Sequence, residues 1–257
     1  MRHGGTYLTT QPRLSQILPP PPTIGRGLSH IEAAELSNIL NVDAIDNFYS
    51  AAVSLSDAIN GLDHGYFSWA TVKLYYSLFY ALRAILCLTD HCIFYFGSKP
   101  RWILAQAGAR ANRTSGTTHK CVLTFYRSRH PQASLLSQPI EAEDSLDWLL
   151  NKRETANYRS YGFEEPKTPS HFEHLMLRNG IRRALEAYIS DQEGIYAFDP
   201  DHAAVALPVR ALGILRNELS VRGSRLETER ADFLRKALKD SRGPFTSVRE
   251  FLLSGIA

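Results

Sequence analysis

The sequence predicts an all-α fold: a helical bundle with a long central helix, a small irregular or β-hairpin insertion after it, and extra helices near the C-terminus. Two observations predict it. Apolar residues recur at three- and four-residue steps over much of the chain, which is the period of an amphipathic helix. The segment 66–88 is apolar on nearly every face, as is typical of a helix surrounded by its neighbours. With 257 residues, the chain is long enough to bury such a core.

An extended arm is expected before the first helix. Residues 1–28 include four consecutive prolines, which favour an extended polyproline conformation over a packed element. Ser29 and Glu32 then have the spacing of a capping box, in which each side chain binds the other residue's backbone N–H. A helix is therefore expected to begin there, and an apolar stripe over residues 42–62 has helical spacing.

The insertion and the later helices follow the central helix. The run "CIFYFG" predicts a short strand, "GARANRTSGTT" an exposed loop and "HKCVLTFYRSR" a short helix. A further helix is expected from about Glu141 through "LDWLLNKRETANYRSYG", with acidic residues in its first turn. A second capping box, Ser170 with Glu173, predicts a long helix that reaches Ile189. Two more helical segments, "AAVALPVRALGILRNELSV" and "ETERADFLRKALK", are expected beyond it, the first kinked at Pro208.

These segments predict three parts in the chain. An extended proline-rich arm covers residues 1–28, a helical domain covers 29–191, and a C-terminal helical extension covers 192–257. No internal repeat relates them. The arm is expected to lie outside the packed core because four prolines in a row cannot join a helix.

Composition indicates a soluble cytoplasmic chain without a membrane span. No run reaches the roughly 20 uninterrupted apolar residues that a bilayer needs, and the N-terminus lacks a secretory pattern. Three cysteines, Cys87, Cys92 and Cys121, are irregularly spaced, so reduced thiols are expected. His91 and His119 lie near two of them, but the spacing is not that of a standard zinc site, and neither a metal nor a cofactor is expected. The net charge of +3 is too small by itself to indicate nucleic acid.

The helix expected from about Glu141 places a charge on an apolar seam. Steps of three and four residues put the following side chains on one side of it: Leu146, Leu149, Leu150, Arg153, Asn157 and Tyr161. Burying an unpaired guanidinium is costly, so Arg153 needs an internal acceptor that holds the bundle together, a second subunit, or a cleft open to water. Periodicity leaves these alternatives open. We expect Arg153 and Asn157 to be accessible in a cleft or to lie across a subunit interface.

Two segments, "YYSLFYALRAIL" and "RETANYRSYGF", resemble the HEPN superfamily of helical domains, which occur in ribonuclease toxins, nucleotidyltransferase partners and antiviral effectors. The first is similar to the long core helix of the family. The second is similar to its signature helix, in which active members carry an Arg followed about four to six residues later, roughly one turn on, by a His. The resemblance covers the chain from about Val42 to Ile189.

The second motif departs from the active pattern. Five positions after Arg153 stands Tyr158, and no His follows before Gly162. The segment is closer to a variant with Arg, Ala, Asp or Asn, and then Tyr, whose members are often non-catalytic or of unknown activity. The resemblance implies that Arg153 would hold a scissile phosphate, Asn157 would orient it, and Tyr158 would take the place of the histidine. A phenol with a pKa near 10 is a poor base at neutral pH, so a degenerate site is expected.

The resemblance also implies a function and partners. The expected function is that of an RNA-directed module in a bacterial-type defence, toxin–antitoxin or stress system, with metal-independent endoribonuclease activity weakened or lost. The alternative is a non-enzymatic interaction subunit that docks a partner protein or nucleic acid in a larger complex. A homodimer, or a complex with a cognate protein, is expected because the active cleft of the family lies between two subunits.

A basic stretch points to nucleic acid independently of the resemblance. No acidic residue lies between Asp90 and Glu141. The candidate contacts with RNA or single-stranded nucleic acid in this stretch are Arg101, Trp102, Arg110, Arg113, Lys120, Tyr126, Arg127 and Arg129. Cations that neutralise phosphates, interleaved with rings that stack on bases, are typical of single-strand binding. The alternative, which stays open, is a loop whose charges balance acidic residues elsewhere, including the cluster that begins at Glu141.

Overall fold

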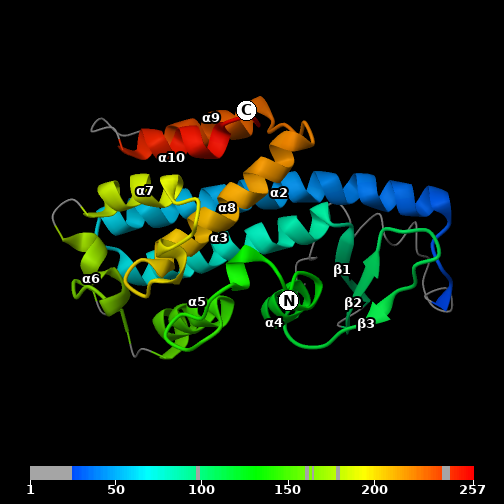
Figure 1. Cartoon of the computed structure of the whole chain (residues 1–257), viewed down its shortest axis with the longest axis horizontal. Coiled ribbons are helices and arrows are strands. Elements are labelled where there is room, and N and C mark those ends of the chain that lie inside the picture. The colour runs from blue at the N-terminus through cyan, green and yellow to red at the C-terminus, as the bar shows by residue number, and fades with distance from the viewer. Residues whose placement is uncertain (1–24, 97–98, 160–161, 164, 178–179, 239–243) are drawn as a thin grey trace. The chain divides into compact units, whose positions relative to one another are not determined.

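A computed structural model of the chain describes residues 25–96, 99–159, 162–163, 165–177, 180–238 and 244–257 (Figure 1). Nearly all of the predicted proline-rich arm lies outside these residues. The described chain is mostly helical, which confirms the coarse prediction, and it adds one three-stranded sheet. It divides into two compact units: one consists of the chain up to Asn47 together with Leu82–Arg129, and the other of Phe48–Ala81 together with His130–Ala257.

Two long helices, α2 (His30–Asp63) and α3 (Phe67–Leu88), each contribute a part to both units. The capping box predicted at the start of α2 is confirmed. The Ser29 backbone N–H donates to Glu32 Oε2 at 2.8 Å, and the Glu32 backbone N–H donates to Ser29 Oγ at 3.2 Å. The apolar stripe over residues 42–62 continues this same helix without a break.

Helix α3 is the predicted core helix. In the described part of the chain it is the one helix that is long and apolar enough to cross a membrane, judged by length and composition. However, 78% of its most apolar window is buried inside the protein, as in the core helix of a soluble protein. Its small and aromatic residues therefore serve internal packing.

The first unit contains the sheet and one further helix. Strands β1 (His91–Phe96), β2 (Lys99–Leu104) and β3 (Asn112–Arg113) are antiparallel and adjacent in that order, and α4 (Thr118–Arg129) follows (Figure 1). The predicted strand and the predicted short helix are confirmed. The segment expected to be only an exposed loop contains the two-residue β3, which pairs with β2.

The second unit is built mostly of short elements around one longer helix. In chain order they are η2 (Ser134–Leu136), α5 (Ser145–Glu154), η3 (Thr155–Arg159), α6 (Ser170–Met176), α7 (Gly180–Ser190), η4 (Tyr196–Phe198), α8 (Ala203–Val221), α9 (Thr228–Ala237) and α10 (Pro244–Leu253). Helix α8 supplies much of the core, since every residue from Ala203 to Val209 is buried. Pro208 lies inside it. Helix α10 was not predicted.

Helix α5 begins later than the sequence indicated. Asp144 is its N-cap, with a carboxylate oxygen that accepts from the backbone N–H of Leu146 at 2.9 Å and of Asp147 at 3.3 Å. Before it, Glu141 and Ala142 have φ values of 49° and 64°, which are incompatible with an α-helix. The expected start at about Glu141 is therefore wrong, and this residue lies in a tight turn instead.

The long helix expected from Ser170 to Ile189 is also wrong, because it is two helices. Helix α6 has Pro169 at its N-cap without a side-chain capping bond, so the second capping box does not form. Helix α7 then starts at Gly180, where a Cβ would collide with the carbonyl oxygen of Leu175. Only glycine fits this close backbone approach.

Candidate functional site

Arg153 lies in the last turn of α5 and is buried, with 7% of its surface exposed. It shares its side of the helix with Leu146, Leu149 and Leu150, which are also buried, as the seam predicted. Its Nη2 donates to the Tyr76 hydroxyl at 3.4 Å. Within a single chain the guanidinium is therefore enclosed rather than open to a cleft.

Two tyrosine rings of α3 surround this guanidinium. The Arg153 Cζ lies 5.6 Å from the ring centroid of Tyr75 and 5.8 Å from that of Tyr76, within the range of cation–π attraction. Burial raises the pKa of the Tyr75 phenol above its usual value, although the Arg153 charge opposes this. The phenol thus stays protonated at neutral pH. The arrangement holds α5 against α3.

Of the other two predicted catalytic residues, Asn157 does not share this environment. Asn157 is exposed, because α5 changes to the π-helix η3 at Thr155. A π-helix has a longer hydrogen-bonded turn than an α-helix, so spacings that place residues on one side of an α-helix no longer apply. The side chain of Tyr158 lies outside the described residues, as does Tyr161. The structure brings Arg153 together with tyrosines of α3, and it separates Arg153 from Asn157.

A polar pocket of about 390 Å³ adjoins the C-terminal end of α5 and contains a histidine that the motif did not indicate. His171, from α6, lies against Thr71 of α3, with 3.2 Å between Nε2 and Oγ1. The Thr71 hydroxyl donates its one proton to the carbonyl oxygen of Phe67 at 3.0 Å, so the His171 Nε2–H donates to Thr71. Burial, and then the charge of Lys152, lower the pKa of His171 to about 4. The imidazole is neutral at pH 7.

Two other polar residues that line this pocket, Lys152 and Ser68, are engaged within the protein. The Lys152 ammonium lies 3.4 Å from Glu141 Oε2 and 4.7 Å from the ring centroid of Trp148. Ser68 donates its backbone N–H and its hydroxyl to the Glu165 carboxylate, at 2.7 and 2.8 Å. These contacts describe a stabilised junction between α3, α5 and α6. His171 lies eighteen positions after Arg153, a spacing that the family motif does not contain.

In the first unit, three cations share one face of the sheet; we call Lys99, Arg101 and Arg113 the basic strip. Lys99 and Arg101 lie two residues apart on β2, so their side chains point to the same face. Arg113 on β3 is directly opposite Arg101 in the strand register. Like charges in directly opposed positions destabilise a sheet, so this pairing needs a reason.

The basic strip is accessible, and no residue that the structure describes is an acidic partner for it. Lys99 and Arg113 are exposed and Arg101 is half-buried. Within the described ranges, none of the three takes part in a salt bridge. The Nε of Arg101 is buried and also lacks a hydrogen-bond partner there. The strip therefore presents positive charge that nothing in the described chain neutralises.

Helix α4 covers the opposite face of the sheet, where Trp102 lies. The Trp102 and Phe125 ring centroids are 5.1 Å apart, and the Arg129 guanidinium lies 4.3 Å from the Trp102 ring centroid. The ring expected to stack on bases is thus occupied by side chains of α4. Tyr126 is buried, which raises its pKa to about 12. The candidate contacts Arg110, Lys120 and Arg127 lie in the loop after β2 and on α4, the first two exposed and the third half-buried.

Among the residues that the structure describes, no group of three or more His, Cys, Asp or Glu side chains could hold a metal ion. Comparisons with protein-family models, curated proteins and solved structures found no match. The resemblance to HEPN domains therefore rests on the two sequence motifs alone.

Proposed function

We propose that this chain is an RNA-binding, HEPN-like module that contacts RNA through the basic strip of its first unit, with Arg153 in a structural role. The observation that carries the proposal is the opposed pair Arg101 and Arg113, with Lys99 on the same face. Such a pair is unfavourable in the free protein and becomes favourable when an anion lies between the charges.

The surroundings of the strip favour a polyanion over a single small anion. Residues 91–140 contain seven Lys and Arg residues and no Asp or Glu, so this stretch of the chain supplies positive charge without an acidic residue to offset it. A phosphate backbone presents regularly spaced charges that such a region can neutralise while releasing counterions. Because Trp102 and Tyr126 are covered or buried, the proposal assigns recognition to phosphates and sugars rather than to stacked bases.

The family resemblance suggests RNA cleavage as well, but the geometry supports binding better. A catalytic Arg must reach the scissile phosphate, whereas Arg153 is enclosed by Tyr75 and Tyr76. The competing function is an interaction subunit, in which an acidic surface of a cognate protein would occupy the same strip. RNA binding and docking of an acidic protein would both use the positive charge of the strip. A test must therefore measure RNA binding directly.

Binding of a fluorescently labelled single-stranded RNA, measured by anisotropy at several salt concentrations, tests the proposal. The test variant carries Lys99→Gln, Arg101→Gln and Arg113→Gln. The control variant carries Arg225→Gln, Arg235→Gln and Lys236→Gln, three exposed residues of the second unit, and so has the same net charge. The strip variant should bind at least about tenfold more weakly, and the slope of log affinity against log salt should fall by about 0.7 for each phosphate that the variant no longer neutralises.

Equal affinities in the strip and control variants would overturn the proposal, and absence of RNA binding in the wild type would favour the interaction subunit. An RNA cleavage assay in excess chelator should accompany the binding measurement. Metal-independent cleavage by the wild type that disappears in a folded Arg153→Met variant would return the functional role to Arg153.

A further inference from the structure

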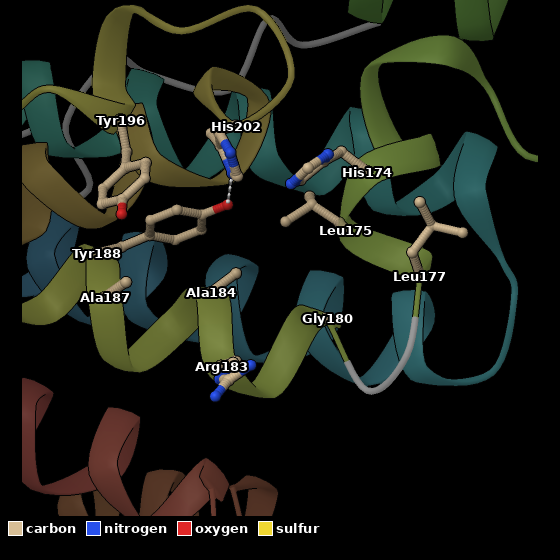
Figure 2. Close-up of a pocket in the computed structure, with 10 residues that line it drawn as sticks. All are labelled: His174, Leu175, Leu177, Gly180, Arg183, Ala184, Ala187, Tyr188, Tyr196 and His202. Atoms are coloured by element: carbon tan, nitrogen blue, oxygen red, sulfur yellow. Dashed lines mark hydrogen bonds between the residues drawn. The ribbon is translucent and has the colours of Figure 1, made fainter.

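A second pocket, of about 480 Å³, lies in the second unit between α6, α7 and the segment that leads into α8 (Figure 2). Its volume is within the range of small-molecule sites, about 300–1,000 Å³. None of the residues that line it is acidic. It shares no residue with the basic strip or with the surroundings of Arg153.

Four aromatic side chains from different elements meet at this pocket. His174 comes from α6, Tyr188 from α7, Tyr196 from η4, and His202 immediately precedes α8. The ring centroids are 4.9 Å apart for His174 and His202, 5.0 Å for Tyr196 and His202, and 5.5 Å for Tyr188 and Tyr196. Rings that served only as core would fill the space between them, because protein interiors are close-packed. Here they border an open volume instead.

The hydrogen bond drawn in Figure 2 fixes the proton on His202. The Tyr188 hydroxyl and His202 Nδ1 are 2.8 Å apart. Burial raises the pKa of Tyr188, so the phenol keeps its proton, and burial lowers the pKa of His202, so its imidazole is neutral. Among the described residues, the acceptor for the Tyr188 hydroxyl proton is His202 Nδ1. Nδ1 therefore carries no proton, and the single proton of the neutral imidazole is on Nε2. His202 Nε2–H has no partner within the described ranges and remains a donor for a ligand.

The side of the pocket that α7 forms is lined by small apolar residues, with one arginine at its edge. Ala184 and Ala187 of α7 contribute small side chains beside Tyr188, which leaves room for a flat ligand (Figure 2). Arg183 lies at the edge of the pocket, away from the two histidines (Figure 2). It is exposed and takes part in no salt bridge with a described residue. The pocket thus offers aromatic faces, one hydrogen-bond donor and one positive charge at its mouth.

We propose that this pocket binds a nucleoside monophosphate, either as a free nucleotide or as the terminal nucleotide of an RNA. The base stacks against Tyr196, a ring carbonyl or ring nitrogen accepts from His202 Nε2–H, and Arg183 pairs with the phosphate. A cationic ligand is disfavoured, because Arg183 would repel it and no carboxylate lines the pocket to attract it. A purely apolar ligand would cover the His202 donor without satisfying it, which is unfavourable.

Isothermal titration of the full chain with adenosine, guanosine, cytidine and uridine monophosphates tests the site, with the four nucleosides and inorganic phosphate as comparisons. At least one nucleotide should bind at least about tenfold more tightly than its nucleoside, since only the nucleotide carries a phosphate that Arg183 can pair with. Arg183→Gln should remove that difference, whereas Arg225→Gln, a control at another exposed arginine, should leave it unchanged. Tyr196→Ala should weaken nucleotide and nucleoside alike by about fivefold or more, because the base has no ring to stack on.

The two sources of the ligand are separated by an RNA with a 5′-monophosphate and the same RNA with a 5′-hydroxyl, tested on the basic-strip variant. Preference for the phosphorylated end that Arg183→Gln removes assigns the pocket to an RNA end. Binding of free nucleotide without such a preference assigns it to the free nucleotide. No nucleotide binding at about 1 mM, or inorganic phosphate binding as tightly as the nucleotides, overturns the proposal. The strip variant keeps this pocket, so failure of the strip to bind RNA leaves this test intact.

Discussion

The basic strip and Arg153 both present arginines that the sequence suggested for phosphate contact, and their surroundings are opposite. Arg153 is 7% exposed and lies among the rings of Tyr75 and Tyr76. Arg113 is exposed and lies opposite another arginine. The first environment satisfies a guanidinium internally, and the second leaves it in need of an anion. A motif places an arginine in the chain, but burial and partners decide what the arginine does.

The difference leads to opposite expectations for stability. Removing a buried cation that is stacked on aromatic rings takes away packing and attraction, so it destabilises the fold. Removing the exposed member of a like-charge pair takes away repulsion, so it stabilises the fold or leaves it unchanged. Residues that bind a ligand often reduce the stability of the free protein, and the basic strip fits that pattern.

The largest effect is expected at Arg153. Arg153→Ala should lower the free energy of unfolding by about 3 kcal/mol, because it leaves a cavity against α3 and removes two cation–π contacts. Arg153→Met fills most of the same volume and should lower it by less than half as much. Urea unfolding followed by circular dichroism measures both values.

RNA affinity at constant salt completes the comparison, because neither Arg153 variant should change it while both remain folded. A large decrease in RNA affinity in Arg153→Met, with stability close to that of the wild type, would contradict the structural role. It would place the phosphate contact in the second unit.

The next effect concerns His171 and depends on pH. Its folded-state pKa of about 4 lies below the value of about 6.5 for an exposed histidine, so the unfolded chain binds the proton more readily. Stability from this residue is therefore complete above pH 6.5 and is lost as the pH falls towards 4. The free energy of unfolding should drop by about 2 kcal/mol between pH 7 and pH 4.5 on this account.

The matched control for this pH dependence is His171→Gln. The glutamine amide can still donate to Thr71 but does not titrate, so carboxylates elsewhere contribute equally to both proteins. The difference in stability between wild type and variant should shrink across this pH window. A difference that stays constant with pH would show that His171 is not held neutral in the fold.

The sequence predicted the elements whose signals are local. Ser29 and Glu32 lie within one helical turn, so their spacing alone identified the start of α2. The apolar segment of α3, the strand β1 and the helix α4 were also visible in short windows. Helix α10 was missed although Phe245, Val248 and Leu252 have helical spacing and are buried. The apolar spacing that predicts a helix was therefore present in the sequence of α10.

Other features depend on groups that the sequence does not bring together. The late start of α5 requires positive φ at Glu141 and Ala142, which neither residue type indicates. The break before Gly180 interrupts a hydrophobic period that continues across it, so periodicity favoured one helix. The change to a π-helix at Thr155 turned Asn157 away from the side that α-helical spacing gave it.

The candidate sites show the same limit. Lys99 and Arg101 could be placed on one face from strand alternation, but their pairing with Arg113 required the register of a two-residue strand. The aromatic pocket joins His174 to His202 across three helices, and no spacing rule connects them. Sequence reasoning identified the basic stretch but could not say which of its cations share a face.

The smallest effect is expected at Arg113, and it tests the basis of the basic strip. Arg113→Thr removes the charge opposite Arg101 and introduces a residue that suits a β-strand, so the free energy of unfolding should rise by about 0.5 kcal/mol at low salt. The gain should shrink as salt increases, because ions already screen the repulsion between exposed charges. Arg113→Lys keeps the charge and should show no such gain.

The same Arg113→Thr protein should bind RNA more weakly than wild type, which would link the stability gain to the removal of an anion-binding group. Thermal unfolding at low and high salt measures the first effect, and anisotropy measures the second. If Arg113→Thr were instead less stable than wild type at low salt, Arg113 would be satisfied within the free protein, and the main physical argument for an anion at the strip would fail.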